Sequence, residues 1–432
     1  MARAMKDSGI EWIGEIPEGW KADSLKRHFS IISGATPKSE NSAFWDGDIP
    51  WITPADFKTS DKFVSHGKRN LTRAGYDSCG TSLIPKGSIV FSKRAPVGTV
   101  AIANNELCTN QGCLSCVVKD HSVPSFYYYA MSVFTEQFEL VSTGTTFKEI
   151  AADVFANFRL PAPSTVDQQK IADYLDTECA QIDAVIDQTR TSIEEYRKLK
   201  QSVITQAVTK GIRPGRKMKD SGIKWVGEIP EDWESINPKA LFSQRKEKAT
   251  AGERQLTASQ QYGVIYQDEY MALTGSKVVT VEKDFDILKH VEAGDFVISM
   301  RSFQGGLEYS TKTGSISSAY VMLIPNLNMV FPRFYRWLLK SSVYINALQS
   351  TSNMVRDGQA MRYSNFAQVR LYSVPLDEQE EIADYLDEKC AAIDQLVKQK
   401  ESFLTELESY KKSLIFEYVT GKRRCRYEER QK

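Results

Sequence analysis

The sequence predicts a mixed α+β protein with a pseudo-two-fold internal repeat, in which two globular domains are joined by two long antiparallel coiled-coil helices. Residues 5–20 and 218–233, the opening motifs, are identical at 13 of 16 positions, and residues 171–183 and 382–394 at 10 of 13. These pairs are separated by 213 and 211 residues, so both copies have nearly the same length. The chain is therefore expected to consist of two equivalent halves.

Each copy ends in a stretch with the periodicity of a long amphipathic helix. Mostly apolar residues recur at alternating steps of four and three over 175–207 and 386–418. Gly211 and Gly421 follow these stretches and mark where the helices end. About 40 residues at 1.5 Å each predict helices of roughly 60 Å. Each helix could cover only its own domain or join a homodimer, but two equal helices in one chain favour antiparallel pairing with each other.

The segments between the shared elements diverge, and they mix β-type runs, glycine turns and helical stretches. Four regions are expected: a first domain with its opening motif at 1–160, a first spacer helix at 161–213, a second domain with its opening motif at 214–372, and a second spacer helix with a tail at 373–432. The tryptophans of the opening motifs are expected to pack against the helices or a partner. They are Trp12, Trp20, Trp225 and Trp233.

The composition limits the classes of function. Lys plus Arg and Asp plus Glu each number 55, and zero net charge argues against a protein that holds nucleic acid by bulk electrostatics alone. The absence of a long apolar run and of a signal-peptide core predicts a cytoplasmic protein. Seven scattered cysteines favour free thiols, and the isolated CxxC of Cys113 and Cys116 does not predict a metal site.

Several longer segments occur in a characteristic order. In the first half they are GATPKSENSAFWDGDIPWITPADF (34–57), IPKGSIVFSKRAPVGTVAI with TNQG (84–112), and STGTTFKEIAADVFANFRLPAPSTVDQQKIADYLD (142–176). In the second half they are YGVI (262–265), GDFVISMRSFQGGLEYSTKTGSISSAY (294–320) and LYSVPLDEQEEIADYLD (371–387). Through these segments the chain resembles, over essentially its full length, the specificity subunit of Type I restriction-modification systems.

The resemblance implies two target-recognition domains, each reading one half of an asymmetric bipartite sequence in double-stranded DNA. It also implies assembly with two modification subunits that methylate adenine at N6 and, in the full enzyme, with restriction subunits. S-adenosylmethionine, ATP and Mg are then expected on the partner subunits, and no cofactor is expected on this chain.

Basic and amide side chains in turn-rich segments are the candidates for DNA contact, because such groups read base edges and bind phosphate. The candidates are Lys93, Arg94 and Lys148 in the first half, and Arg301, Gln304 and Arg362 in the second. Arg362 corresponds to Lys148 when Gly144 and Gly358 are aligned with a small gap. The alternative for each candidate is a solvated surface charge, which is also expected for the basic linker of Arg213, Arg216, Lys217 and Lys219.

Two other classes of function are considered. A self-contained DNA-modifying enzyme is expected to carry an Asn/Asp-Pro-Pro-Tyr/Phe motif or a P-loop, but the chain has no Pro-Pro pair and its Gly-Lys pairs lack the P-loop flanks. The histidines are dispersed, at His28, His66, His121 and His290, so no catalytic or metal-binding residue is assigned. A coiled-coil structural protein that does not bind DNA is the third class, and the helices alone do not exclude it.

Overall fold

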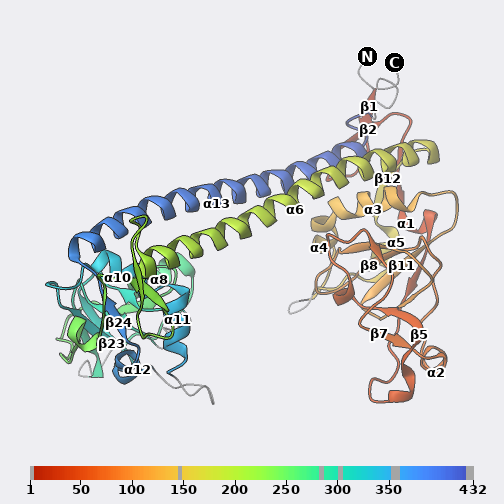
Figure 1. Ribbon diagram of the computed structural model, residues 1–432. Coiled ribbons are helices and arrows are strands. Elements are labelled where there is room, and N and C mark those ends of the chain that lie inside the picture. Colours follow the sequence, from red (N-terminus) through yellow and green to blue (C-terminus); the bar gives the residue numbers. More distant parts are fainter. Residues whose placement is uncertain (1–3, 145–147, 282–286, 300–304, 352–360, 425–432) are drawn as a thin grey trace. The chain divides into compact units, whose positions relative to one another are not determined.

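The computed structural model forms two compact units, and each is described by itself (Figure 1). The first comprises Met1–Thr189 with Ser402–Lys432, and the second comprises Arg190–Glu401. Each unit contains a β-rich domain and a stretch of both long helices, α6 (Thr165–Lys210) and α13 (Leu376–Val419), which confirms the mixed α+β prediction. The structure describes residues 4–144, 148–281, 287–299, 305–351 and 361–424.

The domain of the first unit is built on a sheet with the strand order β4-β11-β8-β9-β6, in which only β6 and β9 pair in parallel. A smaller sheet has the order β10-β5-β7, and the pairs β1–β2 and β3–β12 lie outside both. The strands are β1 (Met5–Asp7), β2 (Glu15–Pro17), β3 (Lys21–Ser24), β4 (Phe29–Ser33), β5 (Trp45–Ile52), β6 (Phe63–Val64), β7 (Arg69–Leu71), β8 (Ile89–Ser92), β9 (Val100–Ala103), β10 (Cys108–Thr109), β11 (Cys113–Val118) and β12 (Arg159–Ala162). The short helices are α1 (Leu25–His28), η1 (Ser42–Phe44), η2 (Pro54–Asp56), α2 (Arg73–Asp77), α3 (Pro124–Val133), α4 (Thr135–Leu140) and α5 (Ala152–Asn157).

The domain of the second unit has a main sheet with the order β16-β23-β20-β21 and four separate strand pairs among its described residues: β13–β14, β15–β24, β17–β18 and β19–β22. The strands are β13 (Met218–Asp220), β14 (Glu228–Pro230), β15 (Glu234–Ile236), β16 (Phe242–Arg245), β17 (Leu256–Ser259), β18 (Gly263–Tyr266), β19 (Lys289–Val291), β20 (Phe296–Ile298), β21 (Glu308–Tyr309), β22 (Gly314–Ile316), β23 (Val321–Pro325) and β24 (Leu371–Ser373). The short helices are α7 (Pro238–Leu241), α8 (Gln267–Thr274), α10 (Pro332–Leu338), α11 (Ser342–Gln349) and α12 (Tyr363–Gln368).

In the first unit, α6 and α13 run antiparallel. The Nζ of Lys411 lies 2.6 Å from Oδ1 of Asp183, and the rings of Tyr174 and Tyr418 lie 4.5 Å apart. Residues near the start of α6 therefore contact residues near the end of α13, as in an antiparallel pair. The predicted apolar seam faces this pairing, and its members pack in one hydrophobic cluster with the domain.

The second unit repeats this arrangement with the opposite ends of the helices. The Nζ of Lys200 lies 2.6 Å from Asp394, and Nη2 of Arg197 lies 2.9 Å from Glu401. Buried residues near the end of α6 and the start of α13 share a cluster with the second domain. The prediction of antiparallel pairing within the chain is thus confirmed in each unit.

The long helices end where the sequence predicted. Gly211 and Gly421 both have a φ of +72°, a left-handed conformation that glycine adopts without steric cost. The helices contain 46 and 44 residues, so each is roughly 65–70 Å long, slightly more than predicted. Among the described residues, no helix combines the length and the apolar character needed to cross a membrane.

The opening motifs pack against the ends of the long helices. Trp20 is buried beside Gly421 at the end of α13, and Trp233 is buried beside Gly211 at the end of α6. The Nε1 of Trp233 donates to Glu378 over 3.1 Å, and its ring stacks on Tyr372. The remaining tryptophans lie against their own domains: Trp12 stacks on Phe158, and Trp225 donates to the carbonyl of Arg370. The predicted packing against the helices is thus observed for Trp20 and Trp233, whereas Trp12 and Trp225 contact their own domains instead.

A buried glutamine fastens each domain to the start of its helix in the same way. The side-chain oxygen of Gln168 accepts the amide of Val123 (2.9 Å), just before α3. The side-chain oxygen of Gln379 accepts the amide of Phe331 (2.7 Å), just before α10. In both cases the side-chain nitrogen donates to a backbone carbonyl close to the helix start. Two domains of different sequence therefore share one attachment.

A second contact repeats about two turns further along each helix. The hydroxyl of Tyr129 on α3 donates to Asp176 (2.6 Å), and Nε1 of Trp337 on α10 donates to Asp387 (2.8 Å). A cation completes each contact, because Lys62 pairs with Asp176 and Arg333 pairs with Asp387. The glutamine and aspartate contacts together are called the domain attachment below.

We expect the substitution Gln379→Leu to destabilise the second unit by about 1–3 kcal/mol, because it leaves the partly buried amide of Phe331 and the carbonyls of Met329 and Val374 without their partner. Urea unfolding measures this change, and hydrogen exchange at Phe331 localises it. Gln368→Leu, on an exposed face of α12, is the matched control. Equal losses of stability in the two variants would contradict the role given to Gln379.

Candidate nucleic-acid interface

The turn that carries Lys93 and Arg94 is held tightly between β8 and β9. The buried Ser92 hydroxyl lies within donating distance of the carbonyls of Arg94 (3.1 Å) and Pro96 (2.7 Å). Gly98 has a φ of +95°, and a Cβ there would lie 2.5 Å from Cγ2 of Thr135. The end of β8 therefore presents its two basic side chains from a defined backbone.

Glu149 brings together the basic residues predicted in the first domain. Its carboxylate lies 2.9 Å from Nζ of Lys93 and 3.5 Å from Nη1 of Arg94, and it follows the exposed Lys148. Arg94 and Glu149 also form a β-bridge, and the amide of Ile150 donates to the carbonyl of Lys93. The hydrogen bond from Lys93 is the main reason why the pKa of Glu149 is lowered. Lys93 and Arg94 are thus ion-paired rather than freely solvated.

Two glycine-containing turns of the first domain meet beside this group. The amide of Lys93 donates to the carbonyl of Gly112, at the end of the TNQG turn (109–112). Thr36, in the GATP segment, donates to the side chain of the exposed Gln111. Gly34 is needed here, because a Cβ would lie 2.1 Å from the carbonyl oxygen of Thr109. Three segments that are far apart in the sequence therefore form one polar surface.

The structure locates only one of the candidates predicted in the second domain. Arg301 and Gln304 lie outside the described residues, as does Gly358, which the alignment with Lys148 requires. Arg362 is exposed just before α12, where its amide donates to the side chain of Asn365 over 3.1 Å. The correspondence between Arg362 and Lys148 stays a prediction.

Sequence reasoning missed Glu149, although it is adjacent to a candidate. Its function depends on two residues more than 50 positions away, and no local pattern indicates that pairing. A carboxylate beside a lysine is usually a solvated pair, so only the β-bridge between the two segments reveals it.

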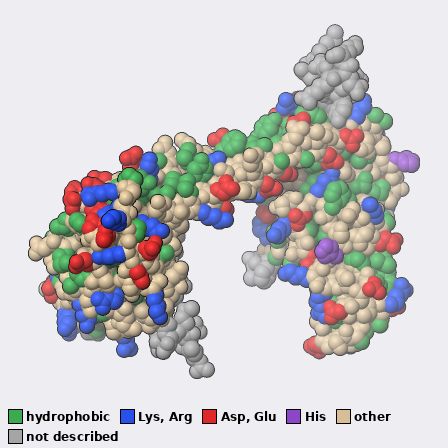
Figure 2. Space-filling model, viewed as in Figure 1, with side chains coloured by type: hydrophobic (Ala, Val, Ile, Leu, Met, Phe, Trp, Pro, Cys, Tyr) green, Lys and Arg blue, Asp and Glu red, His purple; other side chains and the backbone are tan. Residues whose placement is uncertain are grey.

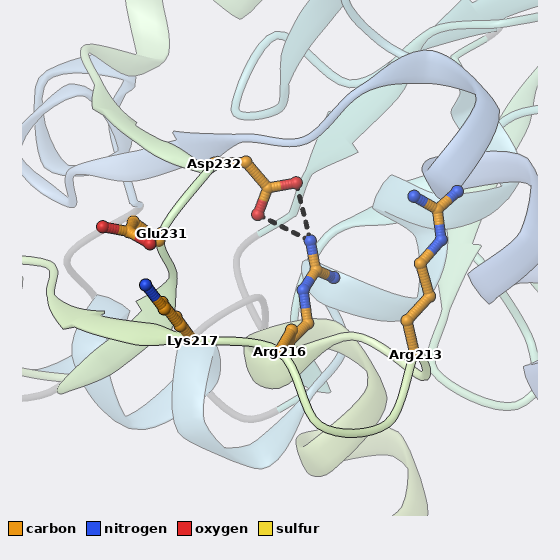
Figure 3. Close-up of a pocket in the computed structure, with 5 residues that line it drawn as sticks. All are labelled: Arg213, Arg216, Lys217, Glu231 and Asp232. Atoms are coloured by element: carbon orange, nitrogen blue, oxygen red, sulfur yellow. Dashed lines mark hydrogen bonds and ion pairs between the residues drawn. The ribbon is translucent and has the colours of Figure 1, made fainter.

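The basic linker after α6 is not freely solvated, which corrects the prediction for Arg213 and Arg216. Arg213 pairs with Glu381 (2.9 Å) and Arg216 pairs with Asp232 (2.6 Å), and Arg216 also pairs with the buried Glu378. An open hollow of about 470 Å³ is lined by Arg213, Arg216, Lys217, Glu231 and Asp232 (Figure 3). Figure 3 shows Arg216 directed at Asp232, so its charge is already balanced. The linker ties the end of α6 to the start of α13.

The CxxC cysteines lie on β11 and are buried in different hydrophobic clusters. Burial is the main cause of the raised pKa of both the Cys113 and the Cys116 thiol. Within the described part of the chain, no group of three or more histidine, cysteine or acidic residues is arranged to hold a metal ion.

The chain is similar to several known proteins. The family profile described as "Type I restriction modification DNA specificity domain" matches residues 17–195. The chain is 39% identical, over 38% of its own length and 38% of the relative's, to the "Type I restriction enzyme MjaIX specificity subunit" of Methanocaldococcus jannaschii. It is 24% identical to the "Putative type I restriction enzyme MjaX specificity subunit" of the same organism, over 96% of both chains.

The chain is therefore similar to the specificity subunits of Type I restriction-modification enzymes. A solved chain described under "Structural basis underlying complex assembly and conformational transition of the type I R-M system" shares its fold, with a TM-score of 0.70 and 13% identity over 94% of this chain and 98% of that one. Specificity subunits are the non-catalytic component of their enzymes. Lys93, Arg94 and Lys148 lie within the residues that the profile matches, and Arg362 lies beyond them.

The second domain contains a histidine between two carboxylates. Nδ1 of His290 lies 3.0 Å from Glu253, and Nε2 lies 3.0 Å from Glu292. Burial by itself disfavours the imidazolium, but the hydrogen bonds to Glu292 and Glu253 outweigh it and raise the pKa of His290. The same contacts contribute to the lowered pKa of each glutamate.

A stability difference that depends on pH follows from the raised pKa of His290. Its contribution is fully present below the usual histidine pKa of about 6.5 and is lost as the pH rises through the higher pKa of the folded state. We expect the melting temperature of the wild type to exceed that of His290→Gln most at about pH 6, with the difference shrinking toward pH 9. Thermal unfolding across this range is the measurement, and the exposed His66→Gln is the control. A difference that grows with pH would disprove the assignment.

Proposed function

We propose that this chain is the DNA-recognition subunit of a Type I restriction-modification enzyme and that it reads a bipartite, asymmetric target in double-stranded DNA, with one half-site for each domain. The single observation that carries the proposal is the domain attachment: Gln168 and Gln379 fasten two different domains to equivalent helices. A constant attachment with variable domains suits two readers of different sequences. The long helices then serve as the spacer between the half-sites.

The proposed partners are two adenine-N6 modification subunits and, for cleavage, restriction subunits. Exposed apolar side chains on the helices support a protein partner, because such side chains are otherwise unfavourable in water. Figure 2 shows hydrophobic side chains at the surface of the long helices. The exposed ones include Val185, Phe403 and Tyr410 in the first unit, and Leu199 and Leu396 in the second. S-adenosylmethionine, ATP and Mg bind the partner subunits in this proposal, and the complex acts on DNA in the cytoplasm.

The first-domain surface favours DNA recognition over a purely structural coiled coil. Lys93, Arg94 and Lys148 gather beside the exposed Gln111, so the surface offers both phosphate-binding and base-reading groups. Their charge is local, which reconciles DNA binding with a neutral chain. Arg362, Arg301 and Gln304 are proposed to act in the same way in the second domain.

The proposal is tested by mapping N6-methyladenine across a genome in cells that express the modification subunit with and without this chain. We expect methylation at a split motif, with two specified parts separated by a fixed gap, only when the chain is present. Cells with the modification subunit alone are the control. Methylation that is unchanged on removal of the chain, or that occurs at an undivided motif, would refute the function.

We expect the double variant Lys93→Ala/Arg94→Ala to weaken target binding by the assembled complex by about 5- to 150-fold for each base-reading side chain that it removes, which corresponds to about 1–3 kcal/mol. Loss of a side chain that binds only phosphate would instead lower the slope of log affinity against log salt concentration by about one, which corresponds to one released ion. Binding of fluorescent duplexes at several salt concentrations separates the two cases. Lys86→Ala, before the other end of β8, is the matched control. Equal binding by the two variants would remove Lys93 and Arg94 from the interface.

A further inference from the structure

The hairpin β17–β18 of the second domain presents a tip of polar and aromatic residues. Ser259 pairs with Gly263 at the end of the ladder, which leaves residues 260–262 as the turn. Gln260, Gln261 and Tyr262 are all exposed. Gly263 has a φ of +68°, as expected for the residue that closes a three-residue hairpin turn. The tip is short, so its side chains project from a defined backbone.

Hydrogen bonds brace the hairpin at its tip and just before its first strand. The hydroxyl of Ser259 accepts the amides of Gln261 (3.3 Å) and Tyr262 (3.4 Å). At the other end, the side-chain amide of Gln255 exchanges two hydrogen bonds with the backbone of Val281, of 2.7 and 2.9 Å. Both ends of the hairpin are therefore fixed before any ligand binds.

A largely buried ion pair holds the tip against the rest of the domain. The Nζ of Lys340, just after α10, lies 2.9 and 2.8 Å from the two carboxylate oxygens of Glu308 on β21, whose side chain is only 5% exposed. The same Nζ lies 3.4 Å from the carbonyl of Gln260. Gly305 accommodates the Gln260 side chain, because a Cβ there would lie 2.5 Å from it. Since a buried pair is costly unless its geometry is well satisfied, it suits a positioning function better than a stabilising one.

The exposed groups of the tip match the requirements of base reading. The major groove of duplex DNA admits a two-stranded β-ribbon, and a glutamine amide pairs with N6 and N7 of adenine through two hydrogen bonds. Gln261 is exposed at the centre of the turn, between the exposed Gln260 and Tyr262. A sequence-independent phosphate contact would instead call for a cation at the tip, where residues 260–262 have none.

We propose that the β17–β18 tip is a base-reading element of the second domain, in which Gln261 reads an adenine in the major groove and the Lys340–Glu308 pair positions the tip. This inference rests on the proposed function. It assigns to the second half-site a group that does not depend on Arg301, Gln304 or Arg362.

The test compares the methyladenine maps of complexes that contain wild-type, Gln261→Ala or Gln261→Glu subunits. We expect Gln261→Ala to make one position of the second half-site degenerate and to reduce cognate binding by about 5- to 150-fold. The first half-site and the gap should stay the same. Gln261→Glu preserves the length of the side chain but only accepts hydrogen bonds, so it should shift that position toward cytosine. Gln368→Ala, an exposed glutamine of the same domain, is the control.

The outcomes separate the two proposals. A split wild-type motif that both Gln261 variants leave unchanged would overturn the hairpin assignment and preserve the proposed function. A change in the first half-site would also overturn the assignment. A wild-type complex that yields no split motif would refute the proposed function, and the hairpin assignment would be refuted too because it rests on that function. Thermal unfolding of each variant, expected to match the wild type within a few degrees because Gln261 is exposed, guards against a folding defect.

Discussion

The packing of α6 against α13 determines what each compact unit contains. In the first unit, Ile182 and Ile186 of α6 are buried in one cluster with Leu414 and Tyr418 of α13. Each such side chain contributes about 1.5–3 kcal/mol through burial, so neither helix stretch would be stable without the other. Residues more than 200 positions apart are thereby joined in one cooperative core. The second unit depends on the same pairing with the other helix ends.

This pairing also explains why the two domains tolerate divergence. Each domain reaches its helix through the domain attachment and through a buried tryptophan of an opening motif, Trp20 or Trp233. These contacts lie at the shared parts of the repeat. The turns of each domain that lie away from the helices take no part in them. The opening motifs and the first turns of the long helices can therefore stay nearly identical while the turns that face a ligand change. Recognition of an asymmetric target requires two different binding surfaces, and the shared helices and opening motifs allow two such surfaces to be held in the same way.

The electrostatics of the candidate surfaces are local rather than global. Lys93 and Arg94 are held by Glu149, and the two arginines of the linker, Arg213 and Arg216, are balanced by Asp232, Glu378 and Glu381. Cations that are paired in this way attract random DNA weakly, because the partner carboxylate offsets much of their field. The neutral composition and the paired cations therefore both indicate a weak non-specific attraction for DNA. Recognition by such a chain depends on shape and on specific contacts more than on bulk charge.

Much of the architecture was determined by the sequence itself, because the repeat, the four-three spacing and the helix-ending Gly211 and Gly421 can be read from neighbouring residues. The position of Lys93 in a turn-rich segment, together with its basic side chain, also predicted it as a candidate for DNA contact. Only the tertiary structure decided which distant residues meet: Glu149 joins Lys93 through a β-bridge between separate segments, and no local pattern encodes that contact. Periodicity determines which face of an element is buried, whereas the partner of a polar side chain is chosen by the packing of the whole fold.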